Sequence, residues 1–475
     1  MSYGRIAADN CRLQKMSCRF AKGDLRMTII RKSLGKATPV QLLVMGFVLV
    51  ILTGAILLAL PISSSKGDWG PFIDALFTAT SAISTTGLTV VDTGSYYSLF
   101  GQIVVLVLIQ IGGLGYMVLI AFAAYAMGRK LSAPAAKVFQ ESLSGVSFDT
   151  AKRFALLTIL FTFLFEFAGA VILSLYWMRQ FSIWRSIYLG AFHSISGFCT
   201  AGFGLFSDNM CSCRPSVVVN LTVCLICIAG GIGFFVLIEA IDLLRKIARH
   251  RYPRRLSTHT RLALTASVVL MAGGAAIIFF AERPGSGQGL GERLLVSVFQ
   301  SVSASTTTGY NTADIGAMSS TSLLTMIFLM FVGASPGGTG GGIKTTTFAA
   351  LLLLLLSQWR GRQEVVMCGR QIPDSVLRRA SAVALSAVLL VVCVTLVLTV
   401  SEKASFLQDL FEVVSGFGNV GLSTGITPSL TAAGKLMIIL TMLAGRVGPL
   451  AMGFALVGRP EPSRVSYPRG EVYVG

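Results

Sequence analysis

Residues 303–310 read Ser-Ala-Ser-Thr-Thr-Thr-Gly-Tyr, a run of small hydroxyl-bearing side chains followed by glycine and an aromatic residue. Because glycine has no Cβ atom, it lets the backbone turn its carbonyl groups toward a common axis. Carbonyl oxygens on such an axis can replace the water around a cation. A single run of this kind is more often an ordinary Ser/Thr-rich turn, so the ion-binding interpretation needs independent support.

Three further copies of the run supply that support. Residues 81–88 read Ser-Ala-Ile-Ser-Thr-Thr-Gly-Leu, residues 196–203 read Ser-Gly-Phe-Cys-Thr-Ala-Gly-Phe, and residues 415–422 read Ser-Gly-Phe-Gly-Asn-Val-Gly-Leu. Repetition at a spacing of roughly 110 residues indicates an array of one unit. Four units can surround one axis, so the sequence predicts an ion-selectivity filter built by a single chain. The predicted filter residues are Ser84, Thr85, Thr86, Gly87, Cys199, Thr200, Ala201, Gly202, Thr306, Thr307, Thr308, Gly309, Gly418, Asn419, Val420 and Gly421.

The composition is that of an integral membrane protein. Of the 475 residues, 53% are hydrophobic and only 13% are charged, whereas a soluble domain carries about 25% charged residues. The net charge of +18 is therefore interpreted through the positive-inside rule, and we expect no nucleic-acid partner. The polar, basic N-terminal residues do not have the pattern of a secretory signal peptide.

Each unit combines one long apolar helix, one short helix, a filter copy and a second long segment. In the first unit, residues 40–60 can span a hydrocarbon core of about 30 Å, whereas residues 71–83 are too short; the apolar run 99–127 follows the filter copy. The other predicted outer helices are 154–178, 262–281 and 380–400, the pore helices are 183–196, 292–304 and 406–417, and the inner segments are 216–244, 320–356 and 432–457.

The predicted fold is an all-α integral membrane protein with four parallel helix–pore loop–helix repeats around one central pore. It contains eight transmembrane helices and four pore half-helices. The basic links between units indicate cytoplasmic termini in the cell membrane, with the filters facing outward. The predicted divisions are a basic tail at 1–37, repeats at 38–130, 131–250, 251–360 and 361–458, and a tail at 459–475.

Residues 333–347, Gly-Ala-Ser-Pro-Gly-Gly-Thr-Gly-Gly-Gly-Ile-Lys-Thr-Thr-Thr, interrupt the third inner segment. This glycine density cannot remain a regular helix. A simple re-entrant kink is one alternative; a phosphate-binding loop is disfavoured because the spacing is wrong and no strand precedes it. We predict a flexible gate beneath the filter. Its residues are Gly337, Gly338, Gly340, Gly341, Gly342 and Lys344, together with Arg446 of the fourth unit.

Ionisable residues inside a membrane span usually face a cavity or a partner. Arg446 is therefore expected either to pair with loop carbonyls or to narrow the pore electrostatically. Glu166 is expected to accept hydrogen bonds from pore-helix amides, with a proton relay as the alternative. For Asp74, Asp409 and Glu412, the sequence leaves open whether they are acids of the pore mouth or local anchors.

These motifs resemble those of the Trk/Ktr/HKT superfamily of potassium transporters. The resemblance rests on residues 110–115, 201–203, 333–347 and 445–450, and covers about residues 38–458. Because one outer helix precedes the first filter copy, the chain is most similar to the Ktr-type membrane subunit. The resemblance implies K⁺ uptake, K⁺ at the filter residues, a homodimer, and regulation by a cytosolic ring of nucleotide-binding subunits. Thr200 departs from the asparagine that relatives often carry, which leaves K⁺/Na⁺ discrimination open.

Two other functions remain as alternatives. The first is a Na⁺-permeable or Na⁺-coupled carrier of the same superfamily. The second is a secondary transporter with broken helices around a midplane site, which parallel rather than inverted repeats disfavour. We expect no enzymatic activity and no cofactor besides the transported K⁺ or Na⁺, because the sequence contains no evident nucleophile–base pair or metal-ligand cluster.

Overall fold

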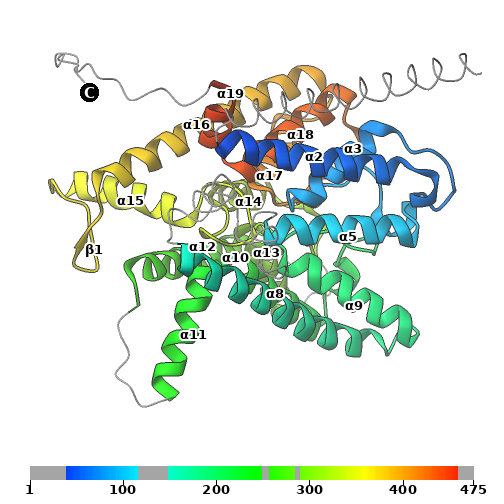
Figure 1. Ribbon diagram of the computed structural model, residues 1–475, viewed down its shortest axis with the longest axis horizontal. Helices are drawn as coiled ribbons and strands as arrows, with labels where there is room; N and C mark the ends of the chain where they lie inside the picture. Colours follow the sequence, from blue (N-terminus) through cyan, green and yellow to red (C-terminus); the bar gives the residue numbers. More distant parts are fainter. Residues whose placement is uncertain (1–38, 116–147, 249–255, 284–288, 458–475) are drawn as a thin grey trace, which may run out of the picture.

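The computed structural model describes residues 39–115, 148–248, 256–283 and 289–457, whose secondary-structure elements are almost all helices (Figure 1). The α-helices are α2 Pro39–Ala59, α3 Phe72–Ile83, α4 Thr93–Tyr96, α5 Leu99–Leu114, α8 Phe148–Trp177, α9 Ile183–Phe198, α10 Val217–Gly231, α11 Phe234–Ala248, α12 Thr258–Ala281, α13 Leu290–Ser305, α14 Ser320–Val332, α15 Thr345–Trp359, α16 Asp374–Ser401, α17 Phe406–Gly418, α18 Ala432–Val447 and α19 Pro449–Val457. The 3₁₀ helices are η1 Pro61–Ser63, η2 Cys211–Cys213, η3 Ile315–Ala317 and η4 Thr427–Ser429.

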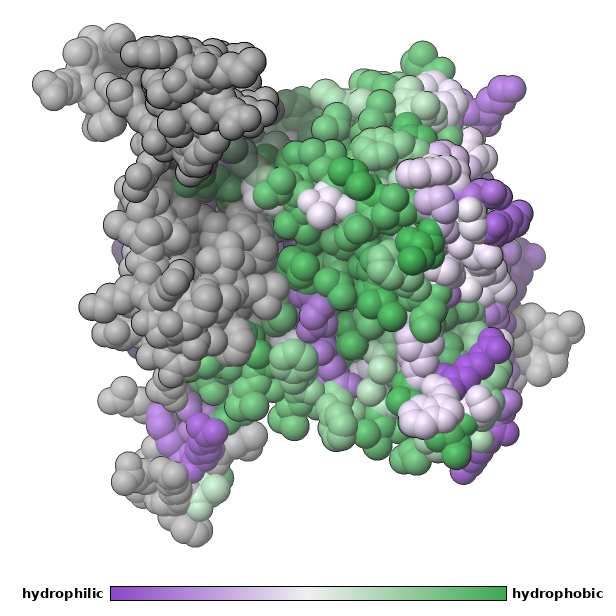
Figure 2. Space-filling model, turned by 45° about the vertical axis from the view of Figure 1, so that its right-hand side comes forward, coloured by the Kyte–Doolittle hydropathy of each residue, from purple (hydrophilic) through white to green (hydrophobic). Residues whose placement is uncertain are grey.

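Several of these helices suit a membrane. Within the described ranges, α2, α8, α12 and α16 are each long and apolar enough to span, and α10 with α11 makes a fifth candidate if the bent pair is one span. Large apolar side chains on them are exposed, such as Phe167 at 71% and Phe280 at 84%. Figure 2 shows a broad hydrophobic surface with hydrophilic residues toward its edges. An apolar surface of this extent belongs in lipid, and the protein is a multi-pass membrane protein.

The short helices lie where the sequence predicts pore helices. They are α3, α9, α13 and α17, and their ends agree with the predicted ranges to within two residues. Each packs against the long helix that precedes it. Each also contacts an inner segment of the preceding unit: α5 packs on α9, α10 on α13, α14 on α17, and α18 on α3. Units one and four therefore meet, and α2 lies beside α19 in Figure 1 although the two are far apart in sequence.

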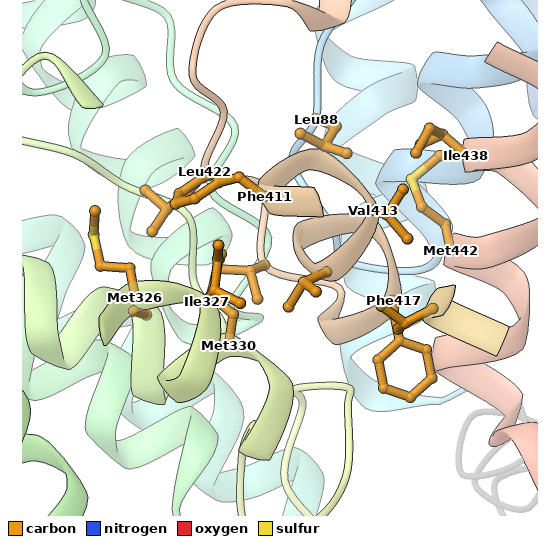
Figure 3. Close-up of a cluster of buried hydrophobic side chains, with 14 of the residues drawn as sticks. Leu88, Met326, Ile327, Met330, Phe411, Val413, Phe417, Leu422, Ile438 and Met442 are labelled. Carbon is orange, nitrogen blue, oxygen red and sulfur yellow. The ribbon is translucent and has the colours of Figure 1, made fainter. Parts of the chain in front are cut away.

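The helix α17 is enclosed by helices of two units. Phe411 and Phe417 are fully buried, and they pack with Met326 and Met330 of α14 on one side and Met442 of α18 on the other (Figure 3). The apolar cluster around α17 joins elements of the third and fourth units. The position of the loop that follows α17 is therefore fixed by packing from two directions.

Two of the predicted inner helices are wrong because they are not continuous. The predicted helix 216–244 breaks at Gly233, where α10 and α11 meet at a bend of 99°. The predicted helix 432–457 breaks at Gly448, between α18 and α19. These glycines have φ values of +95° and +97°, a backbone conformation that an α-helix cannot contain. The far half of the predicted run 99–127 lies outside the described residues.

A positive-φ glycine in fact ends the first part of every inner segment. Gly115 has φ +75° after α5, and Gly333 has φ +66° after α14. At Gly233 the cause is tertiary contact: Phe234 donates its N–H to the carbonyl of Gly337 at 3.0 Å, in the glycine-rich loop of the third unit. The Phe234 N–H, which would bond within a continuous helix, bonds to this loop instead. The break in the inner segment is therefore part of the surface against which the loop packs.

The chain also contains a small β-hairpin that an all-α prediction misses. Strands β1 Val366–Met367 and β2 Arg370–Gln371 pair antiparallel between α15 and α16. Cys368 and Gly369 have φ values of +50° and +74°. Two consecutive positive φ values are typical of a two-residue type I′ hairpin turn.

We predict that Gly233→Ala destabilises the protein. A Cβ atom at Gly233 would lie 2.5 Å from the carbonyl oxygen of Pro336, and the left-handed conformation alone costs about 1–2 kcal/mol for alanine. Thermal unfolding in detergent should show a lower Tm. Gly273→Ala in α12 is the matched control, because nothing lies within 4 Å of its Cβ position. An equal Tm for both variants would contradict this account of the break.

Candidate ion-conduction site

The four filter copies form a closed ring. In each copy, the seventh-position glycine lies against the carbonyl oxygen of the sixth residue in the following copy, so closely that an added Cβ atom would collide with it. The fourth copy meets the first in the same way. The glycine–carbonyl pairs are Gly87 with Ala201, Gly202 with Thr308, Gly309 with Val420, and Gly421 with Thr86.

The copies also share one backbone conformation. In every copy, the glycine and the residue two positions before it have positive φ. A left-handed conformation costs a non-glycine residue about 1–2 kcal/mol. Strain at four equivalent positions is what a backbone shaped for function shows. The non-glycine residues are Thr85 (54°), Thr200 (51°), Thr307 (57°) and Asn419 (51°), and the glycines have φ values of 87°, 64°, 87° and 91°.

The serine that begins each copy explains how this backbone is stabilised. The sixth residue donates its N–H to the carbonyl of that serine over 2.8–2.9 Å. In the first and fourth copies the serine hydroxyl also accepts the glycine N–H, at 3.0 Å for Gly87 and 3.1 Å for Gly421. The N–H to carbonyl pairs are Thr86 to Ser81, Ala201 to Ser196, Thr308 to Ser303, and Val420 to Ser415.

The carbonyl oxygens of the same sixth residues are left without a protein partner. Within the part of the chain that the structure describes, no N–H or O–H donates to them. These are the oxygens that contact the glycine of the neighbouring copy, so they lie around the ring at equivalent positions. A ring of unpartnered carbonyl oxygens in a membrane protein can replace the hydration of a cation. The oxygens belong to Thr86, Ala201, Thr308 and Val420.

A polar cavity of about 310 Å³ opens on one side of the ring. Gly87, Gly202 and Gly421 line it, together with Asn209 and Asn311 from the loops around it. The Asn311 side chain donates to the sulfur of Cys211 at 3.5 Å. Burial raises the pKa of the Cys211 thiol to about 11, so this thiol stays protonated at neutral pH.

The glycine-rich loop covers the ring from another direction and touches all four copies. The carbonyl of Thr339 accepts from Thr85 Oγ1 at 3.2 Å, and the Thr339 hydroxyl lies 3.0 Å from that of Thr200. Gly341 donates its N–H to Thr307 Oγ1 at 3.3 Å. A Cβ atom on Gly341 would collide with Asn419 Oδ1. The loop therefore contacts the strained second residue of the filter tetrad in every copy.

Two cationic side chains hold this loop. Arg446 donates from Nη1 to the carbonyl of Thr339 and from Nη2 to that of Gly112. Lys344 donates to the carbonyl of Gly340, with 2.6 Å between Nζ and the oxygen. Arg446 thus links the loop to α5 of the first unit, whereas Lys344 stabilises the loop internally.

The other predicted gate glycines fit the same close packing. Gly337 accepts the N–H of Phe234, and Gly338 donates to the carbonyl of Ser335 at 3.2 Å. Gly340 leaves no room for a Cβ atom beside Thr307 Oγ1. Gly342 has φ +72°.

The first filter residues of the copies have different contacts. The hydroxyl of Ser84 lies 2.6 Å from that of Thr86, and Thr306 and Thr308 pair likewise at 2.8 Å. In the fourth copy, Gly418 lies against the carbonyl of Met330. Asn419 Nδ2 donates to Thr86 Oγ1 at 2.9 Å and so joins the fourth copy to the first. Cys199 instead contacts Glu166.

The structure gives partners to three of the intramembrane acids that the sequence singles out. The Glu166 side chain accepts from Gln110 and Cys199 rather than from pore-helix amides, so that expectation is wrong. Asp74 pairs with Lys435 at 2.7 Å and is an anchor between α3 and α18. Glu412 accepts from Thr427.

The aromatic end of the third copy makes a contact that the sequence analysis missed. Tyr310 is fully buried, and its hydroxyl donates to the carbonyl of Phe203 at 2.9 Å, at the end of the second copy. A hydroxyl among otherwise apolar eighth residues is the signal that could have identified this link between copies.

We predict that Ser415→Ala destabilises the fourth loop. The Gly421 N–H would lose its acceptor, and an unsatisfied buried donor costs about 1–3 kcal/mol. The measurement is thermal unfolding in detergent, with a lower Tm expected. Ser429→Ala is the control, since its exposed hydroxyl donates to the nearby carbonyl of Ile426. A Tm equal to that of the control would rule out a stabilising role for the Ser415 hydroxyl.

Comparison with known proteins identifies the family. Residues 16–461 match the family profile described as TrkH, cation transport protein. The chain is 39% identical over 444 residues to the Ktr system potassium uptake protein B of Bacillus subtilis, covering 92% of this chain and 97% of the relative. It is 36% identical over 450 residues to the potassium/sodium uptake protein NtpJ of Enterococcus hirae, covering 93% and 98%.

Solved structures include one with the same fold. The potassium transporter TrkH from Vibrio parahaemolyticus superposes with a TM-score of 0.66, at 20% identity, over 87% of this chain and 85% of that one. This family consists of cation transport proteins and is not an enzyme family. The chain belongs to the TrkH/Ktr family of cation transport proteins.

Proposed function

We propose that this protein takes up K⁺ across the cell membrane through the ring of four loops, which acts as the selectivity filter. The observation that carries the proposal is the ring of four unpartnered carbonyl oxygens, one from each copy. The short helices end at the third or fourth residue of the copies, so their partly negative C-termini lie beside the ring and favour a cation. Relatives named as potassium uptake proteins support K⁺ as the ion.

The proposed architecture is four parallel repeats around one pore, with eight membrane crossings and four pore half-helices. Each repeat would contribute its outer helix, pore helix, filter copy and inner segment, the last interrupted at a positive-φ glycine. Cytoplasmic termini and outward-facing filters follow from the basic links between units. In this orientation the polar cavity beside Gly87, Gly202 and Gly421 is the outer mouth.

The glycine-rich loop is the proposed gate. It contacts Thr85, Thr200 and Thr307 on the ring, and a passing ion would meet it directly beneath the filter. Its glycines allow more than one conformation, so a modest difference in binding free energy could shift it between closed and open. A cytosolic ring of nucleotide-binding subunits acting on a homodimer would supply that difference.

Na⁺ transport is the second candidate function. One relative is named as a potassium/sodium uptake protein. Thr200 is the filter residue that departs from the family resemblance described above, and its hydroxyl lies 3.0 Å from that of Thr339 in the loop. Flux in liposomes with Rb⁺ against Na⁺ separates the two candidates, since only a K⁺ filter prefers Rb⁺.

We predict that Gly309→Ser reduces the preference for Rb⁺ over Na⁺ about tenfold, which corresponds to about 1.4 kcal/mol. The added Cβ atom would collide with the Val420 carbonyl and displace one oxygen of the ring. Liposome flux of both ions is the measurement. Gly273→Ser, in open space on α12, is the control. If the permeability ratio of a correctly inserted Gly309→Ser protein is unchanged, the ring is not the filter.

We predict that Arg446→Ala raises K⁺ flux, because it removes both hydrogen bonds that tie the loop to α5. Deletion of residues 337–342 should raise flux further and weaken its dependence on a regulatory subunit. Lys435→Ala is the control on the same helix, since Lys435 pairs with Asp74. A folded deletion protein that conducts no faster than the parent shows that the loop is not a barrier.

A further inference from the structure

A buried polar cluster lies behind the second filter copy. Glu166 of α8 is only 4% exposed, although it sits within a span long enough to cross the membrane. Its carboxylate accepts from Gln110 Nε2 at 3.1 and 3.3 Å, and from the thiol of Cys199 at 3.7 Å. Its own backbone carbonyl accepts from Ser194 of the pore helix α9 at 2.7 Å. Neither the filter nor the gate, as assigned above, includes this carboxylate.

The second copy needs an external partner because of its own sequence. In the first and third copies, the first and third filter residues both carry hydroxyls, and these pair within the copy: Ser84 with Thr86, and Thr306 with Thr308. In the second copy the third filter residue is Ala201, which has no polar atom on its side chain. Cys199 therefore has no internal partner of that kind, and its thiol turns toward Glu166.

The same cluster connects to the loop that covers the ring. Next to Cys199, Thr200 lies with its hydroxyl 3.0 Å from that of Thr339. Thr339 in turn accepts from Arg446, whose other amino group donates to Gly112. Gly112 lies in the last turn of α5, two residues after Gln110. The contacts close into one circuit through the filter copy, the loop, α18, α5 and α8.

We propose that Glu166 is a positioning residue for the second filter copy. Through Cys199 and Gln110 it holds the backbone of this copy in place, whereas the first and third copies are held by hydrogen bonds between their own hydroxyls. The proposal rests on the proposed function for its consequence in transport. Removing the carboxylate takes away the hydrogen-bond acceptor of the Cys199 thiol, so the second filter copy can move relative to the other three. The preference for Rb⁺ over Na⁺ then falls, and Thr339 loses the fixed hydroxyl that Thr200 presents.

The thiol of Cys199 reports on this position without any transport measurement. The test uses full-length protein whose other eight cysteines are replaced by serine. Cys199 is fully buried, and its thiol is hydrogen-bonded to Glu166. Methyl methanethiosulfonate, a small membrane-permeant thiol reagent, should modify it slowly. Glu166→Ala should raise the rate at least tenfold. Glu166→Gln, which keeps the volume and one acceptor oxygen, should give a smaller increase.

The control is Glu292→Ala, which removes a carboxylate from the partly exposed ion pair with Arg214. It should leave both the Cys199 rate and the Rb⁺/Na⁺ ratio unchanged. Size-exclusion chromatography and the helical circular dichroism signal establish that each variant is folded. In proteins that keep all native cysteines, Glu166→Ala should lower the Rb⁺/Na⁺ ratio rather than reduce the flux of both ions equally.

Two outcomes overturn the inference. One is a Cys199 modification rate in folded Glu166→Ala protein that equals that of Glu292→Ala. The other is a faster rate with an unchanged Rb⁺/Na⁺ ratio, because the second copy would then move without affecting the filter. A parent protein that does not distinguish Rb⁺ from Na⁺ at all would instead refute the proposed function, and the modification rates would still decide whether Glu166 positions Cys199.

Discussion

The structure depends on how a non-helical backbone is satisfied inside a membrane. Lipid offers no hydrogen-bond partners, so an exposed N–H at that depth costs several kcal/mol. The serine that opens each copy meets this constraint, because its carbonyl, and in two copies its hydroxyl, takes the N–H groups of the turn. Among the described residues, the carbonyl oxygen of the sixth residue remains free in every copy. In each copy, a serine six residues before the glycine thus binds the N–H of the sixth residue and leaves the carbonyl oxygen of that residue free for the ring.

The ring in turn restricts everything that packs around it. Neighbouring copies can approach closely only because position seven is glycine. The inner segments also contact the ends of the pore helices through glycines. A Cβ atom on Gly112, Gly230 or Gly445 would collide with the last carbonyl before a filter tetrad, that of Ile83, Phe198 or Phe417. The inner segments therefore lie against the filter's supports with no side chain between them. Each ends a few residues later at a positive-φ glycine, Gly115, Gly233 or Gly448.

The sequence predicts the features that repeat and misses those that depend on one unit touching another. The four copies, the pore helices and the interruption near Gly333 are all visible as local patterns. The breaks at Gly233 and Gly448 are not, because a single glycine in an apolar run is compatible with a helix; at Gly233 it is the contact with Gly337 that fixes the bend. Glu166 is likewise recognisable as unusual, but its partner Cys199 lies 33 positions away and only the fold brings them together.

A ring made by one chain differs from a ring made by four identical chains in what a single mutation can do. Here Cys199, Ser84, Thr306 and Gly418 occupy equivalent positions with different chemistry. In a symmetric tetramer, one codon change would alter all four walls at once. In this protein a codon change alters one of the four copies, and the other three copies keep their sequence. The same inequality lets one loop, that of the third unit, contact all four copies of the ring.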